Sequence, residues 1–375
     1  MILTLAMRNL FHDRISLVVT LVGILFSVVL VAVQLGIYAG TSKIITAVAE
    51  HARGDIWISA FGTKSIEESG LLTGNERYIA LATPGVQKVF PIVASFNTWK
   101  RPDGATQLCV VIGAEVADDA LVPWNIVAGG LEQLRLPDAI AIDDTYYENL
   151  GVSGVGSTAE INDQRVRVTT VTHGIRSFTT TPYVFTTLSR ARALQNMPPE
   201  SASFYLVRVE PGANVSAVKA ELEGRLPDHD ILTSQEMKDR SIDHWLFGTG
   251  AGIALIVGAV LGTLVGTVIV AQTLYASTKD HLNEFATLRA LGSSSFYIHR
   301  VILTQAGLSA IIGYALGMSI ALYIVYISTN SRLPIIMTPE LALGLFALTV
   351  SMCAISAISA IIKVTRIDPA MVFSR

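Results

Sequence analysis

The chain has 375 residues, of which 51% are apolar and only 15% charged, and its mean hydropathy is +0.51. Soluble domains usually carry about 25% charged residues, so this composition predicts a membrane protein. The formal net charge of -3 excludes a globally basic nucleic-acid-binding protein, and we expect no nucleic-acid partner. Two cysteines, Cys109 and Cys353, cannot build a disulfide framework, and no intrachain disulfide is expected.

Four long stretches contain no Asp, Glu, Lys or Arg. Each exceeds the ~20 residues that a helix needs to cross the hydrocarbon core. We therefore predict four transmembrane helices, within 17–42, 245–278, 301–327 and 341–362. The first apolar stretch is longer than the ~7–15 residues of a signal-peptide core. It is therefore expected to remain as an uncleaved anchor.

The rest of the chain divides into flanking segments. These are an amphipathic helix at 1–16, a large domain at 43–244, a coupling segment at 279–300, a short loop at 328–340 and a tail at 363–375. Basic residues resist translocation, and they concentrate before the first span, between the second and third, and after the fourth. Both termini are thus predicted to be cytoplasmic, and the large domain is predicted to lie outside the cytoplasm. The N-terminal helix, basic and apolar, suits the inner membrane surface and its lipids.

The external domain is predicted to be α+β. Residues 43–243 contain 18 basic and 25 acidic residues, a net charge of -7. Alternating or β-branched runs bounded by turn residues predict strands, namely Asp55–Ser59, Val89–Ala94, Gln107–Gly113, Ala139–Asp143, Arg165–Thr172, Ser203–Val209 and Asp230–Thr233. Turn residues at 101–104 predict a hairpin between Phe96–Lys100 and Thr106–Ile112.

Two β-α-β units are predicted at the ends of this domain. Asn214 is placed as the N-cap of a helix over Asn214–Leu226, between two strands. A helix around Asn75–Ala82 lies between the strands at 55–59 and 89–94. The two units would form one subdomain that flanks a β-rich insertion at 116–200.

Glycines at four-residue spacing mark the second span. Gly258, Gly262 and Gly266 lie on one helix face and allow another helix to approach closely, either within the chain or at a dimer interface. The spans carry no ionisable residue of the kind that a proton relay or ion-coupled carrier uses. The energy for any transport is therefore expected from elsewhere.

The coupling segment predicts a short helix with an apolar stripe. Leu282, Phe285, Leu288 and Leu291 recur at three-residue steps, and Gly292 offers a stop. One interpretation is a helix on the inner leaflet, and the other is a surface that docks into a partner's groove. We place the docking surface on Lys279, Asp280, Leu282, Glu284, Phe285, Leu288, Arg289, Leu291 and Gly292.

The sequence contains none of the nucleotide-binding, metal-binding or catalytic motifs that we sought. The P-loop pattern does not occur, so the chain is not expected to be a P-loop ATPase itself. The histidines form no H-E-x-x-H or Cys/His pairing, and His173 is interpreted as a loop residue. The acidic pairs Asp118-Asp119 and Asp143-Asp144 are interpreted as solvated surface. No metal, cofactor or catalytic residue is predicted.

The chain resembles the FtsX/MacB-type permeases of ABC transporters, and within them the DevC-like branch. The resemblance covers nearly the whole chain and is carried by Gly54–Ile58, Gly174–Phe185, the residues Glu284 and Leu288–Gly292, and the C-terminal Asp368-Pro369-Ala370-x-Val372-Phe373. The order Lys279-Asp280-His281-Leu282-Asn283-Glu284 departs from the family's pattern at the docking segment.

The resemblance implies a homodimeric inner-membrane permease with two copies of a separate ABC ATPase, which would bind the ATP and Mg²⁺. It also implies a periplasmic external domain in a porter-plus-Sabre arrangement, a periplasmic fusion protein of HlyD/MacA type and a TolC-like outer-membrane channel. ATP-driven movement would be transmitted to the external domain to expel periplasmic substrate. An FtsX-like protein that activates a cell-wall hydrolase without transport is the alternative, and a membrane-anchored receptor without an ATPase is a third.

Overall fold

The computed structural model describes residues 2–281, 284, 287, 293–328, 331 and 334–365. The described residues form two compact units. The membrane unit is drawn from 1–40, 253–329 and 334–375, and the external unit comprises mainly 41–252. Each unit has its own buried apolar core.

The membrane unit is a bundle of helices. Four of them are long and apolar enough to cross a membrane, as predicted, and they are α2 (Arg14–His51), α8 (Ala251–Asp280), α10 (Ser295–Ser328) and α11 (Pro339–Thr365). The shorter α1 (Ile2–His12) precedes them. Asp13 separates α1 from α2 and caps α2, because its Oδ1 accepts a hydrogen bond of 3.1 Å from the Ser16 N–H.

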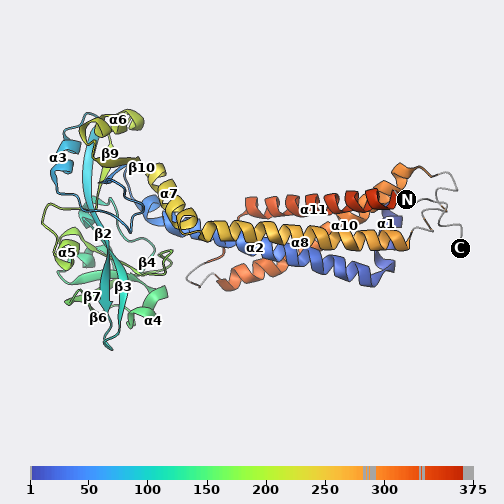
Figure 1. Ribbon diagram of the computed structural model, residues 1–375. Coiled ribbons are helices and arrows are strands. Elements are labelled where there is room, and N and C mark those ends of the chain that lie inside the picture. The colour runs from blue at the N-terminus through green and yellow to red at the C-terminus, as the bar shows by residue number, and fades with distance from the viewer. Residues whose placement is uncertain are drawn as a thin grey trace. The chain divides into compact units, whose positions relative to one another are not determined.

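Helix α2 is longer than the span predicted at 17–42. It continues to His51 because Thr41–His51 contains no glycine or proline to interrupt it. In this extension Val48 and Ala49 are buried in the core of the external unit. One helix thus supplies residues to both units (Figure 1).

The first sheet of the external unit interleaves two β-α-β units. They are β1 (Ile56–Ala60), α3 (Asn75–Leu81) and β2 (Val86–Lys100), and β9 (Phe204–Val209), α6 (Val215–Arg225) and β10 (His229–Thr233). The strand order is β10-β1-β9-β2, and each neighbouring pair is antiparallel. Each unit therefore has a strand of the other between its own two strands, which is the split β-α-β arrangement.

The second sheet grows from the far half of β2. Residues 86–92 of β2 pair with β9, whereas 93–100 pair with β3 (Thr106–Ala114) in the predicted hairpin. The order continues β3-β8-β5-β7-β4 with β6 beside β7, through β4 (Ile126–Ala128), β5 (Ala139–Asp143), β6 (Thr158–Ile161), β7 (Gln164–Thr172) and β8 (Tyr183–Thr187). The predicted insertion at 116–200 supplies β4–β8, and the sheet also takes in the earlier residues 93–114.

Short helices complete the external unit. They are α4 (Tyr147–Leu150), α5 (Leu188–Leu194), α7 (Ser234–Ile242), the 3-10 turns at 116–118, 131–135 and 144–146, and a π-helix over Asp243–Gly248. The predicted cap is present, since Asn214 Oδ1 accepts from the N–H of Ser216 at 2.9 Å.

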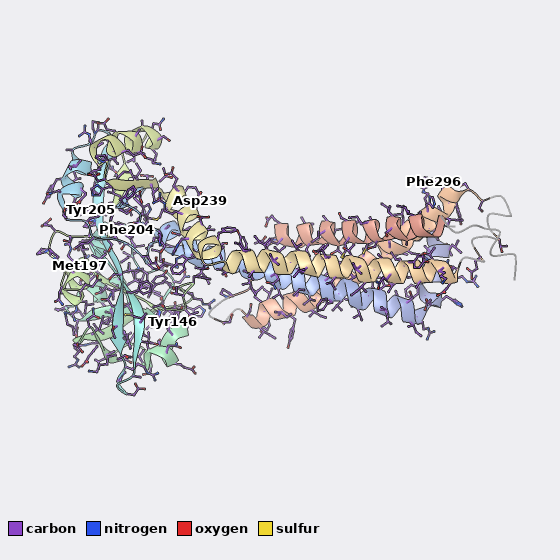
Figure 2. All side chains as sticks on the ribbon, viewed as in Figure 1. Tyr146, Met197, Phe204, Tyr205, Asp239 and Phe296 are labelled. Carbon is purple, nitrogen blue, oxygen red and sulfur yellow. The ribbon has the colours of Figure 1, made fainter. Side chains whose placement is uncertain are left out.

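The neighbours Phe204 and Tyr205, labelled in Figure 2, are buried in different cores because successive strand side chains point to opposite faces.

Candidate functional site

The predicted docking surface lies largely outside the described residues. The structure places Lys279 and Asp280 in the last turn of α8, and His281 Nδ1 lies 3.2 Å from Glu284 Oε2. The other predicted docking residues, Leu282, Phe285, Leu288, Arg289, Leu291 and Gly292, are outside the described part of the chain. Docking at this segment remains a prediction.

The structure places the glycines of α8 against α2 of the same chain. A Cβ atom on Gly258 would lie 2.7 Å from Gln34 Nε2, one on Gly262 would lie 2.9 Å from Leu30 Cδ2, and one on Gly266 would lie 2.5 Å from Ser27 Cβ. The Ser27 hydroxyl also donates a 2.9 Å hydrogen bond to the Gly262 carbonyl. These glycines therefore serve close helix packing within one chain.

Helix α10 approaches α2 in the same way. Cβ atoms on Gly313 and Gly317 would lie 2.5 Å and 2.8 Å from Ile24 Cγ2 and Val28 Cβ. Ile24 and Val28 are buried, at 0% and 2% exposure. Helix α2 is thus approached closely by both α8 and α10 through glycines on their surfaces.

A buried carboxylate joins three segments of the external unit. Glu67, in the loop between β1 and α3, is only 6% exposed. Its Oε1 accepts a very short hydrogen bond from the Tyr183 hydroxyl, and its Oε2 accepts one of 3.3 Å from Trp245 Nε1. Tyr183 begins β8 and Trp245 lies in the π-helix. We call Glu67, Tyr183 and Trp245 the Glu67 cluster.

Burial and charge shape the Glu67 cluster. The pKa of Tyr183 is well above its usual value, first because the ring is fully buried and then because the Glu67 carboxylate lies beside it. The Tyr183 hydroxyl therefore stays protonated and acts as a donor. The Phe178 ring, in the loop between β7 and β8, lies 5.5 Å from the Trp245 ring, and His244 Nε2 lies 3.4 Å from Glu68 Oε2.

The loop that carries Phe178 is itself firmly held. Asp143, at the end of β5, is buried and accepts hydrogen bonds from the Ile175 N–H at 2.7 Å and the Thr172 hydroxyl at 3.0 Å. Ser177, Thr179 and Thr181 form a chain of hydroxyl contacts at 2.8 and 3.0 Å. Asp143 is thus a satisfied structural carboxylate, which corrects its interpretation as solvated surface.

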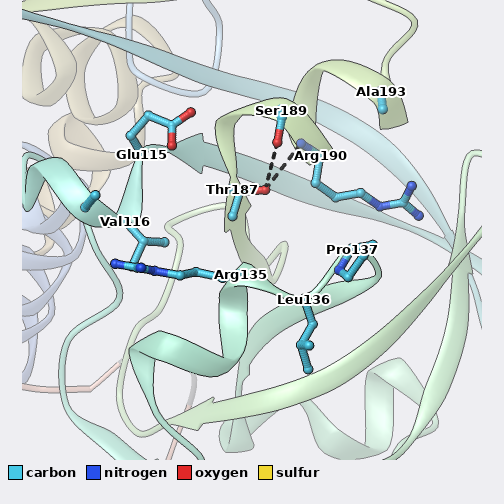
Figure 3. Close-up of a pocket in the computed structure, with 10 residues that line it drawn as sticks. Glu115, Val116, Arg135, Leu136, Pro137, Thr187, Ser189, Arg190 and Ala193 are labelled. Carbon is cyan, nitrogen blue, oxygen red and sulfur yellow. Dashed lines mark hydrogen bonds between the residues drawn. The ribbon is translucent and has the colours of Figure 1, made fainter.

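Beside the second sheet lies a hollow of about 630 Å³, lined by charged, polar and apolar residues of α5, the end of β8 and neighbouring loops. Figure 3 shows these lining residues. The cations of the hollow are engaged elsewhere: Arg190 donates to Gln164 Oε1 at 3.1 Å and to the Arg165 carbonyl at 2.7 Å, and Arg135 Nε lies 3.2 Å from Glu132. The polar groups do not converge on a ligand position. Among the described residues, no three His, Cys, Asp or Glu side chains cluster as a metal site.

The sequence reasoning did not single out the Glu67 cluster. Its members are 116 and 178 residues apart, and no local pattern indicates that Glu67 is buried. The sequence offered two signals for this cluster. Trp245 lies at the start of the predicted span at 245–278, and Tyr183 belongs to the run Gly174–Phe185 that carries the family resemblance.

Two family models match the chain. Residues 17–225 match the MacB-like periplasmic core domain, and residues 253–369 match the FtsX-like permease C-terminal domain. The two matches correspond to the first span with most of the external unit, and to the remaining membrane helices. A search of curated proteins found no significant match.

Solved structures also resemble the external unit. The periplasmic region of MacB from Actinobacillus actinomycetemcomitans is 13% identical, with a TM-score of 0.38, and the match covers 52% of this chain and 96% of that one. The extracellular domain of the noncanonic ABC-type transporter YknZ from Gram-positive bacteria is 11% identical, with a TM-score of 0.36. This match covers 48% of this chain and 98% of that one.

Proposed function

Because the chain belongs to the FtsX/MacB-type ABC transporter permeases, we propose that it is the permease subunit of a MacB/DevC-type exporter. In this role it passes ATP-driven conformational change across the inner membrane to its periplasmic domain. The observation that carries the proposal is the pair of family matches, one for each half of such a permease.

The composition of the helix bundle favours transmission of conformational change over ion-coupled transport through the helices. The predicted spans at 17–42, 245–278, 301–327 and 341–362 contain no Asp, Glu, Lys or Arg, and the helices approach each other through glycines. Ion-coupled carriers need ionisable groups within the membrane. ATP hydrolysis in a separate subunit is therefore the proposed energy source, and this chain is proposed not to be an enzyme.

The proposed assembly has several partners. Two ABC ATPase subunits, which bind ATP and Mg²⁺, would dock on residues 279–292 of two copies of this chain. A fusion protein of HlyD/MacA type and a TolC-like channel would receive substrate outside the inner membrane. Lipids would cover the exposed apolar face of α8, where Val260 and Leu264 are 53% and 56% exposed. Both termini would be cytoplasmic, as the basic flanks indicate.

The FtsX-like match over 253–369 supports a second candidate. In it the same movement activates a periplasmic cell-wall hydrolase and nothing is transported. The two candidates share the ATPase and differ in the periplasmic partner.

Affinity purification of the full chain from its native host, with mass spectrometry of the bound proteins, tests both. Recovery of an ATPase and a fusion protein supports export. An ATPase with a hydrolase or its activator supports signalling, and recovery without any ATPase contradicts both.

A further inference from the structure

One member of the Glu67 cluster, Trp245, lies six residues before the start of α8 in the chain. The π-helix over 243–248 follows α7 directly, and Gly250, with φ of +78°, separates it from α8. A left-handed residue interrupts helical hydrogen bonding. Helical structure is therefore interrupted at Gly250, between the π-helix and α8.

The π-helix is nevertheless fixed to the rest of the external unit. Trp245 binds the Glu67 carboxylate and packs against Phe178, and the Trp245 carbonyl accepts from the Thr249 hydroxyl at 2.5 Å. A π-helical turn adds a residue per turn and is often found at functional sites. Here it carries Trp245, 9% exposed, in a buried position.

The loop that carries Glu67 is anchored on both sides. The Ser69 hydroxyl donates to the Ala94 carbonyl of β2 at 2.9 Å, and Arg240 of α7 donates to the Thr63 carbonyl at 3.2 Å. Glu67 therefore does not swing freely when Trp245 moves. Because its other oxygen holds Tyr183, the carboxylate ties the π-helix to the start of β8 in the second sheet.

We propose that the Glu67 cluster is the link that passes displacement of the π-helix to the loop 174–182 and the second sheet. In this proposal Glu67, Tyr183 and Trp245 are positioning residues, which keep the movement from being absorbed at Gly250. This inference rests on the proposed function, because that function supplies the ATP-driven displacement.

Hydrogen-deuterium exchange of the full chain, purified with its ATPase, tests the link. Exchange is measured with and without ATP and vanadate in the segments 243–248 and 174–182. In the wild type both segments respond to trapping. In Trp245→Phe and Tyr183→Phe the response of 243–248 persists, and that of 174–182 falls about fivefold, the factor that corresponds to one lost hydrogen bond.

Two matched variants control for the loss of any buried hydrogen bond. Trp99 Nε1 donates to the Leu150 carbonyl at 3.0 Å and the Tyr205 hydroxyl donates to the Glu200 carbonyl at 2.9 Å, both away from the cluster. Trp99→Phe and Tyr205→Phe are expected to keep the wild-type response in both segments. Trp245→Phe retains an aromatic ring beside Phe178, so it remains informative if Tyr183→Phe assembles poorly.

The outcomes separate the two levels of the proposal. A wild-type response of 174–182 in both cluster variants overturns the link and leaves the proposed function intact. A wild-type complex in which 243–248 does not respond to ATP and vanadate contradicts the proposed function, and the link with it.

Discussion

At the residue scale, glycine at 266 is required by the separation of α8 and α2. A Cβ atom there would meet Ser27 Cβ at 2.5 Å and Met352 Sδ at 3.0 Å. Real Cβ atoms essentially never approach other heavy atoms so closely. A larger side chain must therefore push α8 away from α2, with loss of the contacts around Gly262.

Gly266→Leu is expected to lower the free energy of unfolding of the membrane unit by about 2 kcal/mol, because overpacking displaces neighbouring side chains. The detergent-solubilised chain should then unfold at a lower temperature. Gly344→Leu is the matched control, since no heavy atom lies within 4 Å of a Cβ on Gly344 in α11. Equal unfolding temperatures of the two variants would contradict the packing role.

Two buried residues make the external unit sensitive to alkali. Burial raises the pKa of Cys109 from 9.0 to about 12 and that of Tyr205 from 10.0 to about 12. Well below pH 9 both groups are protonated in the folded and unfolded chain, so their ionisation does not change stability. Between pH 9 and 12 the unfolded chain ionises first, and stability should fall as pH rises.

Thermal unfolding of the Cys109→Ala variant, measured between pH 8 and pH 11, checks this alkaline effect. The unfolded thiol ionises over about this pH range. The loss of stability with rising pH should be smaller than in the wild type. Asp103→Asn, an exposed change in the neighbouring turn, should leave the wild-type slope. An unchanged slope in Cys109→Ala would show that the thiol does not contribute.

At the scale of elements, two helices meet around the edge strand β10. Val218 of α6 shares a core with Ile231, and Met237 of α7 shares the other core with Leu232, so the helices pack on opposite faces of the sheet. Lys219 Nζ lies 2.6 Å from Glu236 Oε1 and joins the helices across the edge. Unpaired edge strands favour association with other chains, and charges there oppose it.

Lys219→Met is expected to lower the free energy of unfolding by at most about 1 kcal/mol, because the ion pair is partly exposed. The difference should vanish in 1 M salt, where the Debye length is only about 3 Å. The Lys219→Met substitution should also increase self-association of the chain, measured by analytical ultracentrifugation. Glu223→Gln is the control, since it removes a weaker 3.6 Å contact and leaves Lys219 beside Glu236.

Local signals in the sequence identified several elements correctly. The hairpin of β2 and β3, the Asn214 cap and the strand Ala139–Asp143 depend on neighbouring residues, which a pattern can reveal. Strand β8 was not predicted. It pairs in parallel with β3 and antiparallel with β5, both distant in sequence. The Glu67 cluster escaped prediction for the same reason, since only the folded sheets bring its members together.

At the scale of the whole molecule, the coupling segment provides a direct test of the ATPase partnership. Phe285→Asp should abolish co-purification of the ATPase, because the change places an unpaired charge in the proposed docking surface. Phe285→Leu keeps an apolar side chain and should preserve co-purification. Retention of the ATPase by Phe285→Asp would refute docking at this residue, and the measurement is quantitative mass spectrometry of the purified complex.

The neighbouring positions of β1 and β10 have a consequence for how such proteins diversify. Ile56 lies opposite Thr233, so the chain leaves the first sheet one strand away from where it entered. A segment whose two ends lie together can be exchanged for another without restructuring what flanks it. The large domain can therefore be exchanged as a unit while the same membrane helices are retained.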